Sequence, residues 1–197
     1  MQSYSLKPVL AGLAAAAALL AATQALAAPV NCPDTAIATD REFTVNTTPS
    51  ATCLTTGNGN INGNGNGNNA DPVITQLGFT LIDKTDTSGG VLNGALNVTG
   101  IGQTSGSFTI NPTVYGLFGQ IAIGFKSGQG QLGPDYAVFT LSGGTTAGTF
   151  SISGQQSLSH ANLYGKGGPS TQVPLPGTVA LMGLGLAGVG MARRRRA

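Results

Sequence analysis

Apolar and polar residues alternate in several short stretches of the chain. Ile121, Ile123 and Phe125 fall on one face of an extended segment, and Phe150 and Ile152 share a face of another. Because successive side chains of a strand point to opposite faces, this period of two predicts half-buried β-strands. The predicted strands cover residues 42–46, 73–82, 91–99, 106–110, 119–126, 136–142, 147–153 and 158–164.

Short sequences rich in Gly and Ser separate these stretches. Ser88-Gly89-Gly90 and Ser142-Gly143-Gly144 are typical of turns. Many short antiparallel strands at this spacing favour an all-β fold, a β-sandwich or a jelly roll. A β-solenoid is the alternative, but the chain shows no fixed repeat length.

The amino terminus departs from the strand pattern. Lys7 precedes an uncharged run rich in Ala and Leu, and Ala25-Leu26-Ala27 fits the small-x-small cleavage rule. We therefore expect a signal helix that signal peptidase removes, so that the mature chain begins at Ala28. A buried amino-terminal helix is the alternative.

The carboxyl terminus has three parts. They are a motif punctuated by prolines, Val173-Pro174-Leu175-Pro176, an uncharged apolar run over 178–192, and a basic stop, Arg193, Arg194, Arg195 and Arg196. The prolines interrupt regular structure, and Arg clusters favour the cytoplasmic side of a membrane. The apolar run predicts a short hydrophobic helix of about 22 Å, which is short for a permanent anchor. The tail is therefore better explained as a sorting signal.

Composition and charge favour export and exclude a nucleic-acid-binding protein. Charged residues make up only 8% of the chain, and Gly numbers 31. With many Thr, Ser and Asn residues, this composition is typical of extracellular β-rich proteins. The formal charge of +2 comes from the two ends, because the region between them has four basic and seven acidic residues and a charge of −3. The basic residues therefore serve targeting.

Two cysteines, Cys32 and Cys53, lie near the mature amino terminus. In an exported chain an even number of cysteines predicts a disulfide, which here would close a loop of about twenty residues and contribute roughly 3 kcal/mol. A metal site is not predicted, since the chain has no C-x-x-C sequence and a single histidine.

Six segments are predicted along the chain. They are a signal peptide (1–27), an amino-terminal segment with the disulfide (28–56), a Gly/Asn-rich flexible loop (57–70), a β-rich domain (71–165), a linker (166–172) and the sorting tail (173–197). The loop is predicted to be flexible because Gly and Asn tolerate positive φ and bring no core-forming side chain. It is similar to the glycine-rich calcium repeats of β-helices, but it lacks their aspartates and predicts no calcium site.

No catalytic constellation is evident. His160 is the only histidine, it lies beside Ser157 and Ser159 in a predicted strand, and the chain has no G-x-S-x-G elbow. We therefore expect a histidine that is hydrogen-bonded within a sheet rather than a member of a triad. No cofactor is predicted.

The central carboxylates show no spacing that selects an acid/base pair. Asp83 and Asp86 flank Lys84 and predict a solvated turn. Asp71 precedes a proline and Asp135 follows one, so both predict caps of turns or strand starts.

Aromatic and amide side chains are the usual means of binding neutral polysaccharide, since flat rings cover apolar sugar faces and amides match hydroxyls. The candidates are Tyr115, Phe118, Tyr136 and Tyr164. Trp is absent, and packing in the core is the alternative role for each of them.

With both ends interpreted, the chain resembles the PEP-CTERM proteins, a class of exported and surface proteins of Gram-negative bacteria. Val173, Pro174 and Pro176 match the family's Val-Pro-Glu-Pro-like motif, and Leu175 occupies the position where glutamate is usual. The resemblance covers about 25 residues and implies transient contact with the inner membrane and processing by an exosortase, a membrane cysteine protease or transpeptidase. It implies export to the cell surface or the medium.

These observations predict a non-enzymatic surface or matrix protein. The resemblance to PEP-CTERM proteins adds a link to exopolysaccharide and biofilm. A secreted hydrolase acting on polysaccharide is one alternative. An adhesin or carbohydrate-binding module, whose strands rich in Thr and Asn bind a flat surface, is another.

Overall fold

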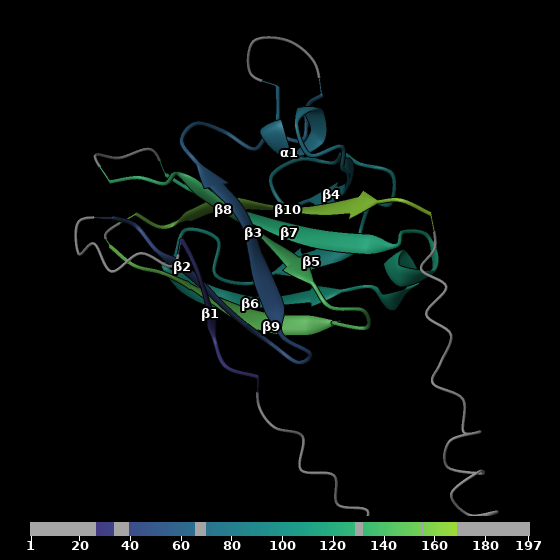
Figure 1. Cartoon of the computed structure of the whole chain (residues 1–197). Helices are drawn as coiled ribbons and strands as arrows, with labels where there is room; N and C mark the ends of the chain where they lie inside the picture. Colours follow the sequence, from purple (N-terminus) through teal and green to yellow (C-terminus); the bar gives the residue numbers. More distant parts are fainter. Residues whose placement is uncertain (1–26, 34–39, 66–69, 129–131, 155, 169–197) are drawn as a thin grey trace, which may run out of the picture.

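The computed structural model describes residues 27–33, 40–65, 70–128, 132–154 and 156–168. Two antiparallel five-stranded sheets pack face to face as a β-sandwich (Figure 1). Sheet A has the order β1 (Val30–Cys32), β2 (Phe43–Thr47), β9 (Ala147–Ile152), β6 (Ser105–Ile110) and β5 (Leu96–Val98). Sheet B has the order β3 (Ala51–Gly57), β8 (Tyr136–Leu141), β7 (Gln120–Ser127), β10 (Leu158–Lys166) and β4 (Thr80–Lys84). The predicted all-β sandwich is confirmed.

The described helices are short. They are α1 (Pro72–Thr75) and a 3-10 helix, η1 (Pro112–Gly116). The predicted signal helix and the predicted hydrophobic helix of the tail lie outside the described residues, as do the sorting motif and Ala25. Ala27 and Ala28, at the predicted cleavage site, precede β1.

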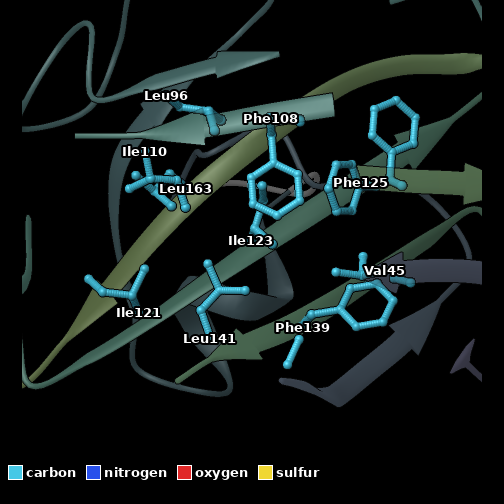
Figure 2. Packing of buried hydrophobic residues seen from close by; sticks show 14 of the residues in the cluster. Val45, Leu96, Phe108, Ile110, Ile121, Ile123, Phe125, Phe139, Leu141 and Leu163 are labelled. Atoms are coloured by element: carbon cyan, nitrogen blue, oxygen red, sulfur yellow. The ribbon is translucent and has the colours of Figure 1, made fainter. Parts of the chain in front are cut away.

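Aromatic rings from both sheets meet in the core between them. The Phe125 ring of β7 stacks on Phe150 of β9, with 4.9 Å between ring centroids. Phe108 of β6 and Phe139 of β8 also contact Phe125, at centroid distances of 5.9 and 6.3 Å (Figure 2). Because such a ring buries a large apolar area and adds favourable aromatic geometry, Phe125 is central to sheet packing. The apolar residues of β7 and of β9 share a core-facing side, as predicted. Of the two, β9 is half-buried as expected, whereas β7 is buried on its other side as well.

A disulfide joins the two sheets near the amino terminus. Cys32 lies in β1 of sheet A and Cys53 lies in β3 of sheet B, and their Cα atoms are 5.3 Å apart. The predicted pairing is therefore confirmed. The bond covalently connects an edge strand of each sheet.

Sheet B is buried on both of its faces. A second apolar cluster covers the side away from sheet A, where Ile61, Val73 and Phe79 pack on Val138 and other sheet residues. In Figure 1, α1 lies on this side of sheet B. Burial on two faces explains why nearly every residue of β7 and β8 is buried.

Sheet A, by contrast, buries alternate residues only. Its inward side chains are mainly apolar and belong to the core. The outward side chains form a surface that we term the open face: Asn31, Thr44, Asn46, Asn97, Ser105, Ser107, Thr109, Ala147, Thr149 and Ser151.

Three details differ from the sequence-based expectations. The strand predicted over 73–82 begins only at Thr80, because Asp71 and Pro72 start α1 as its N-cap and first residue. The strand predicted over 91–99 is confined to Leu96–Val98. Strands β1 and β3 were not expected.

The tract rich in Gly and Asn also contributes a side chain to an apolar cluster, which was not predicted. Residues 57–65, which we term the Gly/Asn segment, supply Ile61, and this side chain is fully buried against sheet B. The expectation that the tract brings no core-forming side chain is therefore wrong.

The disulfide should contribute measurably to stability. Replacing both cysteines, Cys32→Ala with Cys53→Ala, should lower the free energy of unfolding by about 3 kcal/mol, because the unfolded chain gains the freedom of an open loop. Urea unfolding of the two proteins would measure the loss. Reductant should destabilise the parent chain by a similar amount and leave the double variant unchanged; equal stability of parent and variant would contradict the prediction.

Candidate functional site

Three polar side chains lie in a row on the outer face of sheet B. His160, Asn162 and Tyr164 alternate along β10 with Ala161 and Leu163, which point into the sandwich core. Since residues two apart in a strand share a face, the three polar groups all lie beneath the Gly/Asn segment. All three are buried.

A hydrogen-bond network connects this row to the Gly/Asn segment. His160 Nε2 lies 2.7 Å from the Ile61 carbonyl oxygen, and Asn162 Nδ2 donates to the same oxygen at 2.7 Å. Asn162 Nδ2 also lies 2.9 Å from the Tyr164 hydroxyl, which donates to Asp71 Oδ2 at 2.6 Å. Because a carbonyl can only accept, His160 Nε2 carries the proton. The histidine is thus held within the sheet, as predicted.

Asp71 is the most completely bonded carboxylate of the network. Its Oδ1 accepts from the Val73 amide at 2.9 Å, and its Oδ2 accepts from the Gly63 amide at 2.9 Å in addition to Tyr164. The first bond caps α1, so the predicted capping role is confirmed. A fully buried carboxylate with three donors is an anchor for the chain around it.

A second buried group holds the beginning of the Gly/Asn segment. Asp135 Oδ2 accepts from the Gly59 amide at 2.8 Å, and its Oδ1 lies 3.4 Å from Arg41 Nη1. Arg41 is almost fully buried and also donates to the Pro134 carbonyl and the Ser127 hydroxyl. The amides of Gly59 and Gly63 and the carbonyl of Ile61 are therefore bonded from below at three points.

A hollow of about 420 Å³ opens beside His160. Its lining includes Lys126, Ser159, His160 and Asp86. Burial lowers the pKa of Lys126, Asp135 opposes this shift and Arg41 adds to it. The Lys126 ammonium donates to the Ser127 carbonyl.

The remaining carboxylates have separate roles. Asp83 is buried and accepts from the Lys84 and Leu96 amides, so the prediction of a solvated position is wrong for this residue. The reason is that Asp83 fixes the start of β5 to β4, a contact between the sheets that no local sequence shows. Asp86 is exposed and pairs with Lys84 at 3.8 Å, as expected for a solvated turn. Among the described residues, no three His, Cys, Asp or Glu side chains are grouped as metal ligands.

The four aromatic candidates for sugar binding divide into two groups. Tyr164 is fully buried, and the half-buried Tyr115 and Phe118 pack against the core. Burial raises the pKa of Tyr115 to about 12, and its hydroxyl donates to the Thr145 carbonyl at 2.6 Å. These three aromatic residues therefore serve packing. Tyr136 is also buried, in the apolar cluster on the outer side of sheet B, but it lines a hollow as well.

Tyr136 lines a neutral hollow of about 360 Å³, which we term the Tyr136 hollow. Its lining residues include Asn58, Asn60 and Gln76, and none of them is charged. Burial raises the pKa of Tyr136, and the Asp71 carboxylate raises it further, so the hydroxyl keeps its proton.

A glycine makes room for this phenol. Gly57 of β3 lies opposite Tyr136 of β8 in the register, and a Cβ atom at Gly57 would overlap the Tyr136 hydroxyl. The ring and its hydroxyl therefore lie against the backbone of Gly57. Sequence reasoning missed Asn58 and Asn60, because they belong to a tract that predicted only a flexible loop.

Ionisation of Tyr164 should couple to folding. The pKa of Tyr164 is raised well above its ordinary value by burial and by Asp71, so the folded chain holds this proton more tightly than the unfolded chain. Stability should therefore be complete below pH ~10 and fall as the pH rises further. In Tyr164→Phe this fall should be shallower, while stability at pH 8 should be about 1–3 kcal/mol lower because Asp71 loses a donor.

Urea unfolding at several pH values from 8 to 11 would measure both effects. Tyr115→Phe is a comparison variant: its hydroxyl does not contact Asp71, but its pKa is also raised, to about 12, so its removal should make the fall above pH 10 shallower as well. Parallel stability curves for the parent and Tyr164→Phe above pH 10 would refute the coupling.

Comparisons with known proteins identify the tail. Residues 172–196 match the family model described as the PEP-CTERM protein-sorting motif. No curated protein and no solved structure matches the chain. Among the described residues, neither helix has the length and apolarity needed to cross a membrane. The chain carries a PEP-CTERM sorting motif, which implies processing by the membrane protein exosortase and a cell-surface or extracellular location in Gram-negative bacteria.

Proposed function

We propose that this protein is a non-enzymatic component of the cell surface or extracellular matrix that associates with neutral exopolysaccharide. The sorting motif supports the location. The observation that carries the binding role is the Tyr136 hollow, which Tyr136, Asn58, Asn60 and Gln76 line and in which no lining residue is charged.

The chemistry of the Tyr136 hollow suits a neutral sugar. Amides and a phenol both donate and accept hydrogen bonds, which matches the hydroxyls of a saccharide. A charged ligand would find no counter-ion among the lining residues. The volume is at the lower end of ordinary ligand pockets, a size that fits one or two sugar units.

The contacts of the candidate acid/base groups argue against the alternative of a hydrolase. Glycoside hydrolysis needs two carboxyl groups facing one bond, one of them able to give up a proton. Asp71 and Asp83 are each bonded to backbone amides, and Asp135 is bonded to Arg41 and Gly59. His160 donates to a carbonyl and holds the Gly/Asn segment. Each of these groups therefore has a structural partner.

The tail should be removed during sorting. In the parent protein recovered from outside the inner membrane, we expect a carboxyl end near Pro176, because exosortase processing would separate the apolar run and the arginines. Pro174→Ala with Pro176→Ala should abolish this cleavage and leave the chain in the inner-membrane fraction, since an extended motif is lost.

Intact mass spectrometry of each cell fraction would measure the result. Pro169→Ala, outside the matched residues, is the control and should be processed normally. Exported parent protein that retains Arg193 to Arg196 would contradict the sorting role.

The Tyr136 hollow should bind soluble neutral saccharides. Titration with gluco-, manno- and galacto-oligosaccharides, followed by calorimetry or NMR, should show binding by the parent chain. Tyr136→Phe should weaken it about fivefold, the equivalent of one hydrogen bond. Gly57→Ala should weaken it further, because the new methyl group displaces the phenol.

Tyr115→Phe is the control for this experiment, since its hydroxyl bonds to Thr145 and lies outside the hollow. Absence of binding by the parent chain would exclude a saccharide site in the hollow. Release of shorter saccharides that His160→Gln abolishes would support the hydrolase instead.

A further inference from the structure

The open face of sheet A is a large surface without charge. None of the residues in its five strands is Asp, Glu, Lys, Arg or His. The strands of sheet B, in contrast, carry Asp83, Lys84, Lys126 and Lys166. Exposed sheet faces ordinarily hold interspersed charges for solubility, so this distribution needs an explanation.

Hydroxyl and amide groups form regular rows across the open face. The strand register places Thr149 of β9 between Asn46 of β2 and Ser107 of β6, and it places Ser151 in the same way between Thr44 and Ser105. Neighbours within a row are about 4.8 Å apart and successive rows are about 6.7 Å apart, as in any sheet. The result is a periodic array of hydrogen-bonding groups.

Hydrogen bonds hold some of these side chains in place. The Thr44 hydroxyl donates to Asn31 Oδ1 at 3.0 Å, and the Thr99 and Ser107 hydroxyl oxygens are 2.9 Å apart. Ser and Thr side chains are short, so little rotamer freedom is lost when a partner binds. Side chains that are held in place before binding lose less conformational entropy when a partner binds.

The composition of the open face indicates which class of partner it can bind. Protein interfaces usually have an apolar centre, but the exposed large apolar residues of the described chain, Val91, Ile101, Leu117 and Leu132, lie outside the strands of sheet A. Binding to nucleic acid or to another polyanion needs Lys or Arg, which these strands lack. A neutral polymer rich in hydroxyls is the partner that such groups complement.

We propose that the open face docks on neutral polysaccharide chains that lie side by side in an insoluble matrix. A hollow of about 420 Å³ whose lining includes Asn46, Thr146 and Thr149 continues this surface where β2 ends and β9 begins, and it could hold a sugar unit. The proposal rests on the proposed function for the class of partner, but it uses different residues and the other sheet from the Tyr136 hollow.

Adsorption to microcrystalline cellulose and to an insoluble β-1,3-glucan tests the proposal. The full chain, expressed in a Gram-negative host and recovered outside the inner membrane, should sediment with at least one of the two polymers. Thr149→Val, which removes one hydroxyl at constant shape, should weaken adsorption about fivefold. Ser107→Lys with Thr149→Lys should weaken adsorption more than about tenfold, because two long charged side chains keep the polymer from approaching the hydroxyl and amide groups of the open face.

Thr80→Lys is the control, since it adds a lysine at an exposed threonine of sheet B, one positive charge against two in the double variant, and should leave adsorption unchanged. Urea unfolding identifies any variant that is misfolded, and Ser107→Ala with Thr149→Val then replaces the lysine variant. Equal adsorption of the parent and these variants would overturn the proposal, as would adsorption to an alginate gel alone.

The same variants separate the two saccharide-binding surfaces. If the parent chain binds soluble oligosaccharides but does not adsorb to either polymer, the open-face proposal fails and the proposed function stands. If Tyr136→Phe leaves adsorption unchanged while the open-face variants abolish it, the open face is an independent surface. If the parent chain binds neither, both proposals fail.

Discussion

Burial of sheet B on both faces is the constraint on which the rest of the structure depends. An apolar sheet face needs a cover, and here the cover is a segment made largely of Gly and Asn, with Ile61 as its buried side chain. Backbone groups placed over an apolar sheet must find hydrogen-bond partners, because an unpaired buried group costs about 1–3 kcal/mol. His160, Asn162, Asp71 and Asp135 supply those partners. His160, Asp71 and Asp135, which the sequence offers as candidate catalytic groups, instead satisfy the backbone of the Gly/Asn segment and so allow it to pack on sheet B.

The strands could be predicted from the sequence because alternation of apolar and polar residues is a local property. The disulfide could be predicted because cysteines of exported proteins are usually paired. Alternation in β7 and the pairing of Cys32 with Cys53 need no knowledge of the fold. The buried role of Asp83 could not, since it depends on Leu96 lying in the facing sheet. The anchoring of Ile61 could not either, because its partners lie about a hundred residues away along the chain. Asn162, for example, bonds to Ile61 across 101 residues. The lone apolar residue in a Gly/Asn tract was the one local signal of that contact.

The two sheets divide the tasks of the domain. Sheet B holds the described histidine and several charged side chains, and it is covered on its outer side. Sheet A contributes Phe108 and Phe150 to the core and leaves its other side to solvent. The disulfide connects the two sheets at one edge, between Cys32 and Cys53. Sheet B is therefore covered on both of its faces, and the outer side of sheet A is available for contact.

The absence of charge from the strands of sheet A has a consequence for the conditions in which the protein works. Salt screens interactions between exposed charges over about 10 Å at 0.1 M, but hydrogen bonds and close packing between neutral groups are not screened in this way. No side chain of these strands titrates near neutral pH. Contacts made through Thr, Ser and Asn would therefore persist when a bacterium moves between fresh and saline water or acidifies its surroundings.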